Sequence, residues 1–192
     1  MTTSTPADVT PAATPTRERD QLGPMLLQYR VEQFYYAEAR MIDERDFHGW
    51  LGLFTEDTRY LVPIRRNLAS GEYTDSLGDM GLAHFDDGKD VLTRRVLRMS
   101  SGMAWTEDPP SVQRHLVTNV QVNAGDDGEL AVRSCFQAHR YRMDREVEVF
   151  TGARDDLLRP APADHRCEFQ IAARTVYLDH TTVLANNLNL FL

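Results

Sequence analysis

The chain has 192 residues, 42% of them hydrophobic, which is enough for one sizeable core and too few for two full domains. Its 21 basic and 29 acidic residues give a net charge of -8, which argues against nucleic acid as the main partner. No apolar run approaches the roughly 20 residues of a membrane span, and the start lacks the apolar core of a secretory signal, so we expect a cytoplasmic protein without membrane contact.

The sequence is expected to divide into a short arm and one domain. Residues 1–20 are rich in Thr, Pro, Ala and charge. Such a composition buries too little surface to offset the entropy of ordering, so we expect a flexible arm there. Residues 21–192 are expected to form the single domain. Only two cysteines are present, Cys135 and Cys167, which fits a reducing compartment and no disulfide framework.

Apolar residues recur at three- and four-residue spacing after Pro24, and this period predicts the first helix. Glu38 lies on the same stripe. A second, short helix is predicted after Asp46, its candidate N-cap. The apolar stripe of the first helix comprises Leu27, Val31, Phe34, Met41 and Ile42, and that of the second comprises Phe47, Trp50, Leu51 and Phe54.

The middle of the chain predicts a strand, a long loop and a third helix. Residues 58–64 predict the strand, in which Pro63 indicates an edge or a bend. Residues 65–85 are polar and show no clear period, so we expect a loop that is functional or docked against another surface. Asp86 and Asp87 are capping candidates for the helix. Its apolar stripe comprises Leu92, Val96 and Met99, and its expected stop is Gly102.

From Gln113 onward the apolar period changes from helical to alternating, which predicts antiparallel strands. Leu116, Val120 and Val122 are expected to share one face of the first strand. After a turn, the second strand has its own alternating apolar face, which comprises Leu130, Val132, Phe136 and Ala138.

A third strand is predicted near residues 146–151, and residues 152–165 are expected to connect it to a fourth strand that starts near Cys167. Helices followed by long antiparallel strands predict an α+β fold, with a curled sheet wrapped over the helices. The sequence ends in NLNLFL, apolar to its last residue. Because unanchored ends are usually polar, this ending predicts burial inside the sheet or packing against a partner.

Signatures of metal, nucleotide and nucleophilic sites are missing from the sequence. The histidines stand far apart, and no pair has the spacing that places two metal ligands on one helical turn. The two cysteines do not supply the paired clusters of an iron–sulfur site. We find no glycine-rich phosphate loop between a strand and a helix, and no nucleophile elbow. The six histidines are His48, His84, His115, His139, His165 and His180.

Acid–base chemistry is the remaining catalytic hypothesis. Glu38 lies on an apolar helix face, where desolvation would raise its pKa toward neutrality, and Asp46, Tyr60 and His115 are candidates to join it. Such a pocket would make the chain a stand-alone dehydratase or isomerase. In the structural alternative, Glu38 pairs with an arginine such as Arg40, Arg45 or Arg114 and fixes the helix against the sheet. We favour the structural alternative, because an isolated acid specifies no reaction.

Four stretches, taken in order, carry a resemblance to a known family. They read FYYAEARMIDERDFHGWLGLFTEDTRYLVPI, FDDGKDVLTRRVLRMSSGMAWTEDPPSVQRHLVTNVQV, FTGARDDLLR and RTVYLDHTTVLANNLNLFL. The chain resembles the small (beta) subunit of Rieske-type aromatic-ring-hydroxylating dioxygenases from about Val31 to Leu192. Only the N-terminal arm and residues 65–80 lie outside the resemblance.

The resemblance implies a cystatin-like or NTF2-like α+β cone and a partner. That partner is a large (alpha) subunit, which carries the Rieske [2Fe-2S] cluster and a mononuclear Fe(II), and three small subunits join three large ones in an α3β3 hexamer. The resemblance further implies that electrons from NAD(P)H arrive through a reductase and a ferredoxin, and that the complex adds dioxygen to an arene as a cis-dihydrodiol. Family small subunits are mainly structural, so we expect no catalytic, cofactor or metal residue in this chain.

The remaining expectations concern contacts between subunits. WTEDPPS, residues 105–111, is expected to be a rigid polar connector, because its double proline fixes the course of the backbone. Arg114 and His115 begin the next strand and are expected to make interface or internal hydrogen bonds. Aromatic and arginine residues are common anchors of subunit contacts. The expected interface residues are Trp105, Arg114, His115, Phe191 and Leu192.

Overall fold

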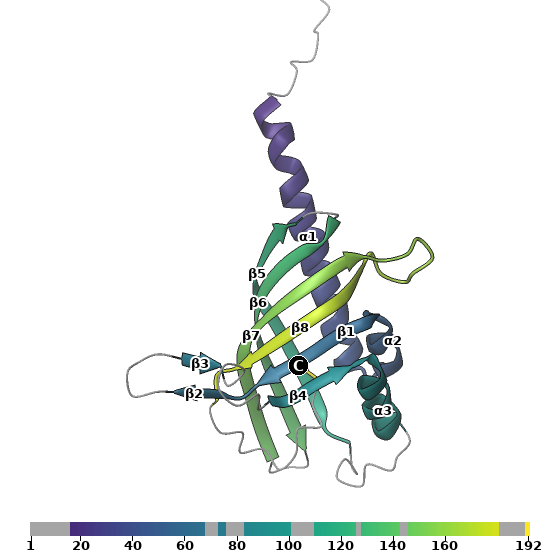
Figure 1. Ribbon diagram of the computed structural model, residues 1–192, viewed down its shortest axis with the longest axis vertical. Coiled ribbons are helices and arrows are strands. Elements are labelled where there is room, and N and C mark those ends of the chain that lie inside the picture. The colour runs from purple at the N-terminus through teal and green to yellow at the C-terminus, as the bar shows by residue number, and fades with distance from the viewer. Residues whose placement is uncertain are drawn as a thin grey trace, which may run out of the picture.

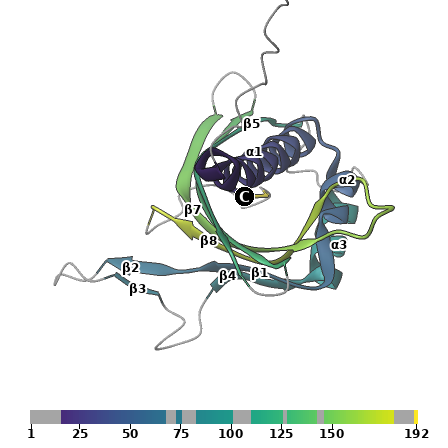
Figure 2. The same cartoon turned by 90° about the horizontal axis from the view of Figure 1, so that it is seen from above.

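The computed structural model describes residues 16–67, 73–75, 83–100, 110–125, 128–142, 146–180 and 191–192. Within these ranges, six strands form one sheet in the order β4-β1-β8-β7-β6-β5, and β2 and β3 form a separate two-stranded sheet. The six-stranded sheet curls around the first helix, which lies inside an open cone (Figure 2). The predicted α+β fold, with helices followed by a curved sheet, is confirmed.

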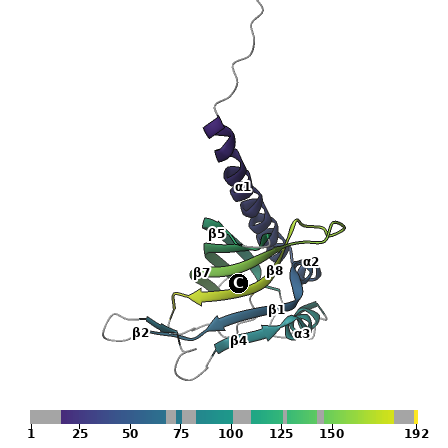
Figure 3. The same cartoon turned by 45° about the horizontal axis from the view of Figure 1, so that its top comes forward.

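The first helix, α1, spans Thr16–Asp43. It begins before Pro24, inside the segment expected to be a flexible arm, and the rest of that arm lies outside the described residues. Pro24 removes one intrahelical hydrogen bond, a loss that this long helix tolerates. The N-terminal turns of α1 project beyond the sheet (Figures 1 and 3). The predicted apolar stripe is confirmed, because the core contains Val31, Phe34, Met41 and Ile42, with Leu27 packed against it.

Two shorter helices, α2 (Phe47–Gly52) and α3 (Lys89–Ser100), lie beside each other next to β1 and β4 (Figure 3). Asp46 caps α2 as predicted, since its side chain accepts a hydrogen bond from the Gly49 N–H at 2.9 Å. The start predicted for α3 is wrong, because Asp86 and Asp87 belong to β4 (Ala83–Gly88), which pairs with β1. The apolar face of α3 is as predicted, with Leu92, Val96 and Met99 buried.

The central strand of the sheet, β1 (Phe54–Pro63), lies between β4 and β8. Pro63 therefore marks a bend, where the pairing register with β4 shifts after Val62. β1 and β8 (Phe169–Leu178) run parallel, whereas the other neighbouring pairs of this sheet are antiparallel. Part of the predicted long loop forms β2 (Arg65–Asn67) and β3 (Tyr73–Asp75), which pair with each other.

The strands β5 (Val112–Ala124) and β6 (Leu130–Arg142) form an antiparallel pair. The alternation predicted for β6 is confirmed by its buried face, which consists of Leu130, Val132, Phe136 and Ala138. The same inward side also carries Ser134 and Arg140, two polar residues that are buried. The interior of the cone is therefore partly polar.

The face predicted for β5 is wrong at Leu116, which is 51% exposed, whereas Val120 and Val122 pack against the core. The register with β6 shifts between Thr118 and Gln121, where Asn119 adopts a positive φ of 53°. A bulge of this kind adds a residue to one strand and moves the following side chains to the other face. The strict alternation assumed from the sequence therefore breaks there.

The strand β7 spans Glu146–Pro160 and continues through much of the segment that was expected to connect two strands. The glycine at position 152 and the charges that follow it resemble a loop in sequence. A Cβ at Gly152 would lie 2.1 Å from the carbonyl oxygen of Tyr177 on β8, so the close approach of the two strands requires glycine. Beyond it, Arg154, Asp156 and Leu158 are all buried.

Candidate functional site inside the cone

A buried cluster of charges joins α1 to β7 and β8. Glu38 of α1 is 1% exposed and Arg174 of β8 is fully buried. The Arg174 guanidinium contacts both oxygens of Glu38 and both oxygens of Asp156. Arg154 Nη1 donates to Glu38 at 3.4 Å, and the Tyr35 hydroxyl donates to Asp156 at 2.8 Å. Two acids thus balance two arginines, as buried charges require.

The surroundings of Glu38 keep this side chain ionised. Burial raises the pKa of its carboxyl group, but the Arg174 and Arg154 guanidiniums and the hydrogen bonds from Arg174 and Trp50 outweigh burial and lower the pKa to about 2. The Trp50 indole N–H donates to Glu38 at 3.1 Å. Glu38 is therefore a carboxylate at neutral pH, without a proton to give to a substrate.

The last two residues of the sequence, Phe191 and Leu192, lie beside this cluster. They are 1% and 2% exposed, and the end of the chain marked C lies inside the curve of the sheet (Figure 2). The Phe191 ring centroid is 4.2 Å from that of Trp50 and 5.5 Å from that of Phe47. The Arg95 guanidinium lies 5.2 Å from the Phe191 centroid, within the range of a cation–π contact.

Hydrogen bonds hold the backbone of this segment. The Tyr60 hydroxyl donates to the Leu192 carbonyl oxygen at 2.6 Å and accepts from the Leu192 N–H at 3.0 Å. Arg174 Nη1 donates to the same carbonyl oxygen at 3.4 Å. The Phe191 carbonyl oxygen is 3.0 Å from His115 Nε2. The segment 191–192 is thus bound by an aromatic slot and by polar anchors.

His115 and Arg114 are neighbours in sequence but lie on opposite faces of β5. His115 is buried, with Nδ1 2.7 Å from an Asp43 carboxylate oxygen at the end of α1. Its backbone N–H donates to the same carboxylate at 3.1 Å. The Arg114 side chain is 65% exposed and donates to Asp43 at 3.1 Å. These two residues make the internal hydrogen bonds that were one of the two expectations for them.

Two of the residues considered for acid–base chemistry, Tyr60 and His115, bind the backbone of the segment 191–192. Glu38 is linked to this segment indirectly, because it pairs with Arg174 and accepts from Trp50, which both contact the segment. Asp46 lies apart, since its carboxylate caps α2 and accepts a hydrogen bond from Arg166 at 3.2 Å. The arrangement therefore places two of the four candidates against a part of the chain itself and links a third to it.

The structural alternative for Glu38 is confirmed, but its expected partners were wrong. Arg174 and Arg154 make the ion pairs, in place of Arg40, Arg45 or Arg114. No signal in the sequence marked these partners, because Arg154 lies in the segment that resembles a loop. An inward-facing arginine is also unusual on a strand.

Of the five residues expected at a subunit interface, only Arg114 lies on the described surface. His115, Phe191 and Leu192 are buried within the chain, so the structure accounts for them as interior residues. Burial of the last two residues answers the question raised by the apolar ending of the sequence. Trp105 lies outside the described residues.

An apolar surface that the sequence did not indicate lies on the outer face of β5, β6 and β7. Val112, Tyr141 and Val147 stand opposite one another across the three strands and are 63%, 43% and 62% exposed. Leu116 and Val149 extend this outer sheet patch. An antiparallel sheet face that meets water is normally polar, so the outer sheet patch is typical of a surface covered in an assembly.

Among the described residues, no group of three or more His, Cys, Asp or Glu side chains is placed to hold a metal ion. Nor does any helix in the described ranges combine the length and hydropathy of a membrane span. Several buried polar groups inside the cone pair with one another, as in the Glu38 cluster, or with the segment 191–192.

Comparisons with known proteins match most of the chain to one family. A family model described as "Ring hydroxylating beta subunit" matches residues 37–185. The chain is 39% identical to benzene 1,2-dioxygenase subunit beta of Pseudomonas putida strain F1 over 167 residues, which cover 86% of this chain and 88% of the relative. It is 37% identical to biphenyl 2,3-dioxygenase subunit beta of Rhodococcus jostii RHA1, with the same coverage.

The fold is also found in a solved structure. The chain superimposes on a chain of naphthalene 1,2-dioxygenase with indole bound in the active site, with a TM-score of 0.77. The two chains are 24% identical, and the match covers 88% of this chain and 86% of the other. At this identity the likeness concerns the fold, in which helices lie within a curved six-stranded sheet.

Proposed function

The chain belongs to the ring-hydroxylating beta subunit family and is a structural component of a dioxygenase; we propose that it assembles with a large (alpha) subunit into an α3β3 hexamer. In that assembly the small subunits also associate with one another as a trimer. The proposal rests on the family and on the outer sheet patch, where Val112, Tyr141 and Val147 leave apolar surface uncovered in the single chain.

The proposed reaction belongs to the complex. A large subunit with a Rieske [2Fe-2S] cluster and a mononuclear Fe(II) adds both atoms of dioxygen to an arene as a cis-dihydrodiol. A reductase and a ferredoxin deliver the electrons from NAD(P)H. Membership of the beta subunit family supports placing both centres in the partner. The relatives named for benzene and biphenyl are almost equally similar to this chain, so the arene is left open.

The role of this chain in the complex is geometric. The Glu38 cluster fixes α1 to the sheet, and the segment 191–192 packs inside the cone, so both contribute to the stability of the domain. The outside is then a rigid surface on which large subunits are held at fixed positions. The alternative of a stand-alone dehydratase or isomerase is not favoured, because arginines bind both oxygens of Glu38 and its low pKa makes this carboxylate a weak base. We place the complex in the cytoplasm.

Co-expression with the candidate large subunit tests the proposal. Light scattering after size-exclusion chromatography should give the mass of an α3β3 hexamer, and iron analysis should find iron only in preparations that contain the large subunit. The chain expressed alone serves as the control and should be colourless. A colourless monomer that ignores the large subunit would overturn the proposal.

A further inference from the structure

The contacts around Phe191 and Leu192 inside the cone resemble those of a ligand-binding site, and the chain itself occupies this site. We propose that Phe191–Leu192 is an intramolecular ligand, and that the same site takes a small arene carrying a hydrogen-bonding oxygen. This inference concerns the single chain and does not depend on assembly with a large subunit. Three observations support it. They are the aromatic slot, the polar anchors, and two buried side chains with donor atoms that have no hydrogen-bond partner.

The aromatic slot selects a flat ring. Trp50 and Phe47 flank the Phe191 ring, at centroid distances of 4.2 Å and 5.5 Å, and Arg95 lies over its face at 5.2 Å. Offset and tilted aromatic contacts and a cation over a ring face both depend on the π electrons of the occupant. A saturated ring of similar size would lose these interactions, so the slot favours an arene.

The polar anchors select an oxygen next to the ring. Tyr60 and Arg174 donate to the Leu192 carbonyl oxygen, and His115 Nε2 faces the Phe191 carbonyl oxygen. Tyr60 also accepts the Leu192 N–H. A hydroxyl group both donates and accepts, so an aryl alcohol matches the anchor at Tyr60 better than a plain hydrocarbon.

Further donors in the same interior are unused by the segment 191–192. Arg154 Nε and Nη2 and Ser134 Oγ have no hydrogen-bond partner among the described residues, although both side chains are buried. The two residues pair directly across β6 and β7. Buried donors of this kind are normally satisfied, and an oxygen-bearing ligand would supply acceptors. The interior is therefore more polar than a site built only to pack a phenylalanine.

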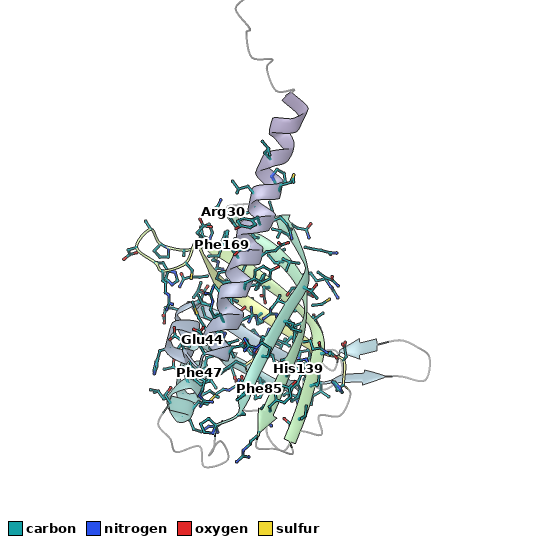
Figure 4. All side chains as sticks on the ribbon, turned by 180° about the vertical axis from the view of Figure 1, so that it is seen from behind. Arg30, Glu44, Phe47, Phe85, His139 and Phe169 are labelled. Atoms are coloured by element: carbon teal, nitrogen blue, oxygen red, sulfur yellow. The ribbon has the colours of Figure 1, made fainter. Side chains whose placement is uncertain are left out.

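The purely structural alternative is that Phe191 is an ordinary core residue. Removing any buried phenylalanine leaves a cavity that an arene can enter, so a matched control is required. Phe169 is suitable, because it is buried at 6% exposure and makes an edge contact with Phe34. Figure 4 shows Phe169 beside Arg30, away from Phe47. A cavity at Phe169 lies outside the set of polar anchors around the segment 191–192.

The test compares a chain that lacks Phe191 and Leu192, in which both the aromatic slot and the polar anchors are free, with Phe169→Ala in the full chain. Benzyl alcohol is the probe, with toluene lacking the oxygen and cyclohexylmethanol lacking the aromatic ring. Binding is measured by titration calorimetry and by tryptophan fluorescence, with Trp105→Phe in every variant so that the signal comes from Trp50, whose ring lines the slot. If the shortened chain folds poorly, the readout is recovery of its circular dichroism on adding benzyl alcohol and not on adding toluene.

We expect benzyl alcohol to bind the shortened chain at least about tenfold more tightly than it binds Phe169→Ala, and more tightly than either analogue binds the shortened chain. Adding Tyr60→Phe to the shortened chain should remove the preference for benzyl alcohol over toluene. Equal binding of the three probes to the shortened chain would overturn the proposal, because an ordinary cavity has no need of the oxygen. So would equal affinity of benzyl alcohol for the shortened chain and for Phe169→Ala.

Discussion

Glu38 would be costly as a lone buried acid, and it is stable only because two arginines meet it inside the cone. Both come from strands more than a hundred residues away in the sequence. The carboxylate accepts from Arg174, Arg154 and Trp50, so it links α1, β7, β8 and α2. Its role is that of a structural junction between elements.

Replacing Glu38 with glutamine should destabilise the fold. Glu38→Gln keeps the size of the side chain but leaves Arg174 and Arg154 without one of their counter-charges, and breaking a buried pair in this way costs about 3–5 kcal/mol. The free energy of unfolding, measured in urea, checks this value. Glu44→Gln, at an exposed residue in the turn after α1, is the control and should change it by less than about 0.5 kcal/mol. A similar effect of the two substitutions would contradict a junction at Glu38.

The same residue predicts how stability depends on pH. The pKa of Glu38 is about 2 in the folded chain, against an ordinary 4.5. A lowered folded pKa means that the contribution is complete above pH 4.5 and is lost as the pH falls toward 2, where the carboxylate takes up a proton. The loss amounts to about 3 kcal/mol. The difference in unfolding free energy between wild type and Glu38→Gln should therefore shrink between pH 5 and pH 3, and a constant difference would count against it.

Among the elements, β7 was predicted only in part from the sequence, and at Gly152 it has the strictest steric requirement. Gly152→Ala should destabilise the chain, because the new Cβ would meet the Tyr177 carbonyl oxygen at 2.1 Å and the Phe136 ring at 3.0 Å. Relieving such a contact with a backbone atom costs about 1–3 kcal/mol or more. Gly52→Ala, where nothing lies within 4 Å of the added atom, is the control. Thermal unfolding of both variants checks the prediction, which fails if their midpoints are equal.

Periodicity predicted the elements whose burial follows hydrophobicity. The α1 stripe and the inward face of β6 are examples, since apolar residues on these elements point to the core. Periodicity failed where polar residues point inward, as at Arg154 and Asp156 of β7. It also failed at the bulge around Asn119, because an added residue reverses the faces of a strand without any change of composition.

Of the candidate site, the sequence identified several side chains but not their arrangement. The sequence predicts Glu38, Tyr60 and His115 as candidates, and the fold places Tyr60 and His115 against Phe191 and Leu192, with Glu38 linked to them through Arg174. That the end of the sequence enters the cone depends on contacts between positions far apart in the chain. Residue types and local spacing do not encode such contacts, so a pocket and a filled core look the same in sequence.

For the whole molecule, the outer sheet patch should decide assembly. Val147 is 62% exposed in the single chain, so Val147→Glu should leave the unfolding midpoint nearly unchanged. In an α3β3 complex that covers this patch, the buried charge should weaken association by tenfold or more, a factor worth about 1.4 kcal/mol. Leu97→Glu on α3, at 54% exposure, is the control and should assemble normally. If both variants assembled equally well, the outer sheet patch would not be part of the subunit interface.

The most direct measurement compares arene turnover with assembly in reconstituted complexes. Turnover per large-subunit iron would be plotted against the fraction of large subunit in the hexamer for wild type, Val147→Glu, Leu97→Glu and Tyr60→Phe. If the chain acts only as a scaffold, all four variants should fall on one line. Val147→Glu should then lose turnover and assembly together. Tyr60→Phe, once assembled, should turn over the arene as wild type does. A fully assembled Tyr60→Phe complex with turnover lost would contradict that role and would place chemistry inside the cone.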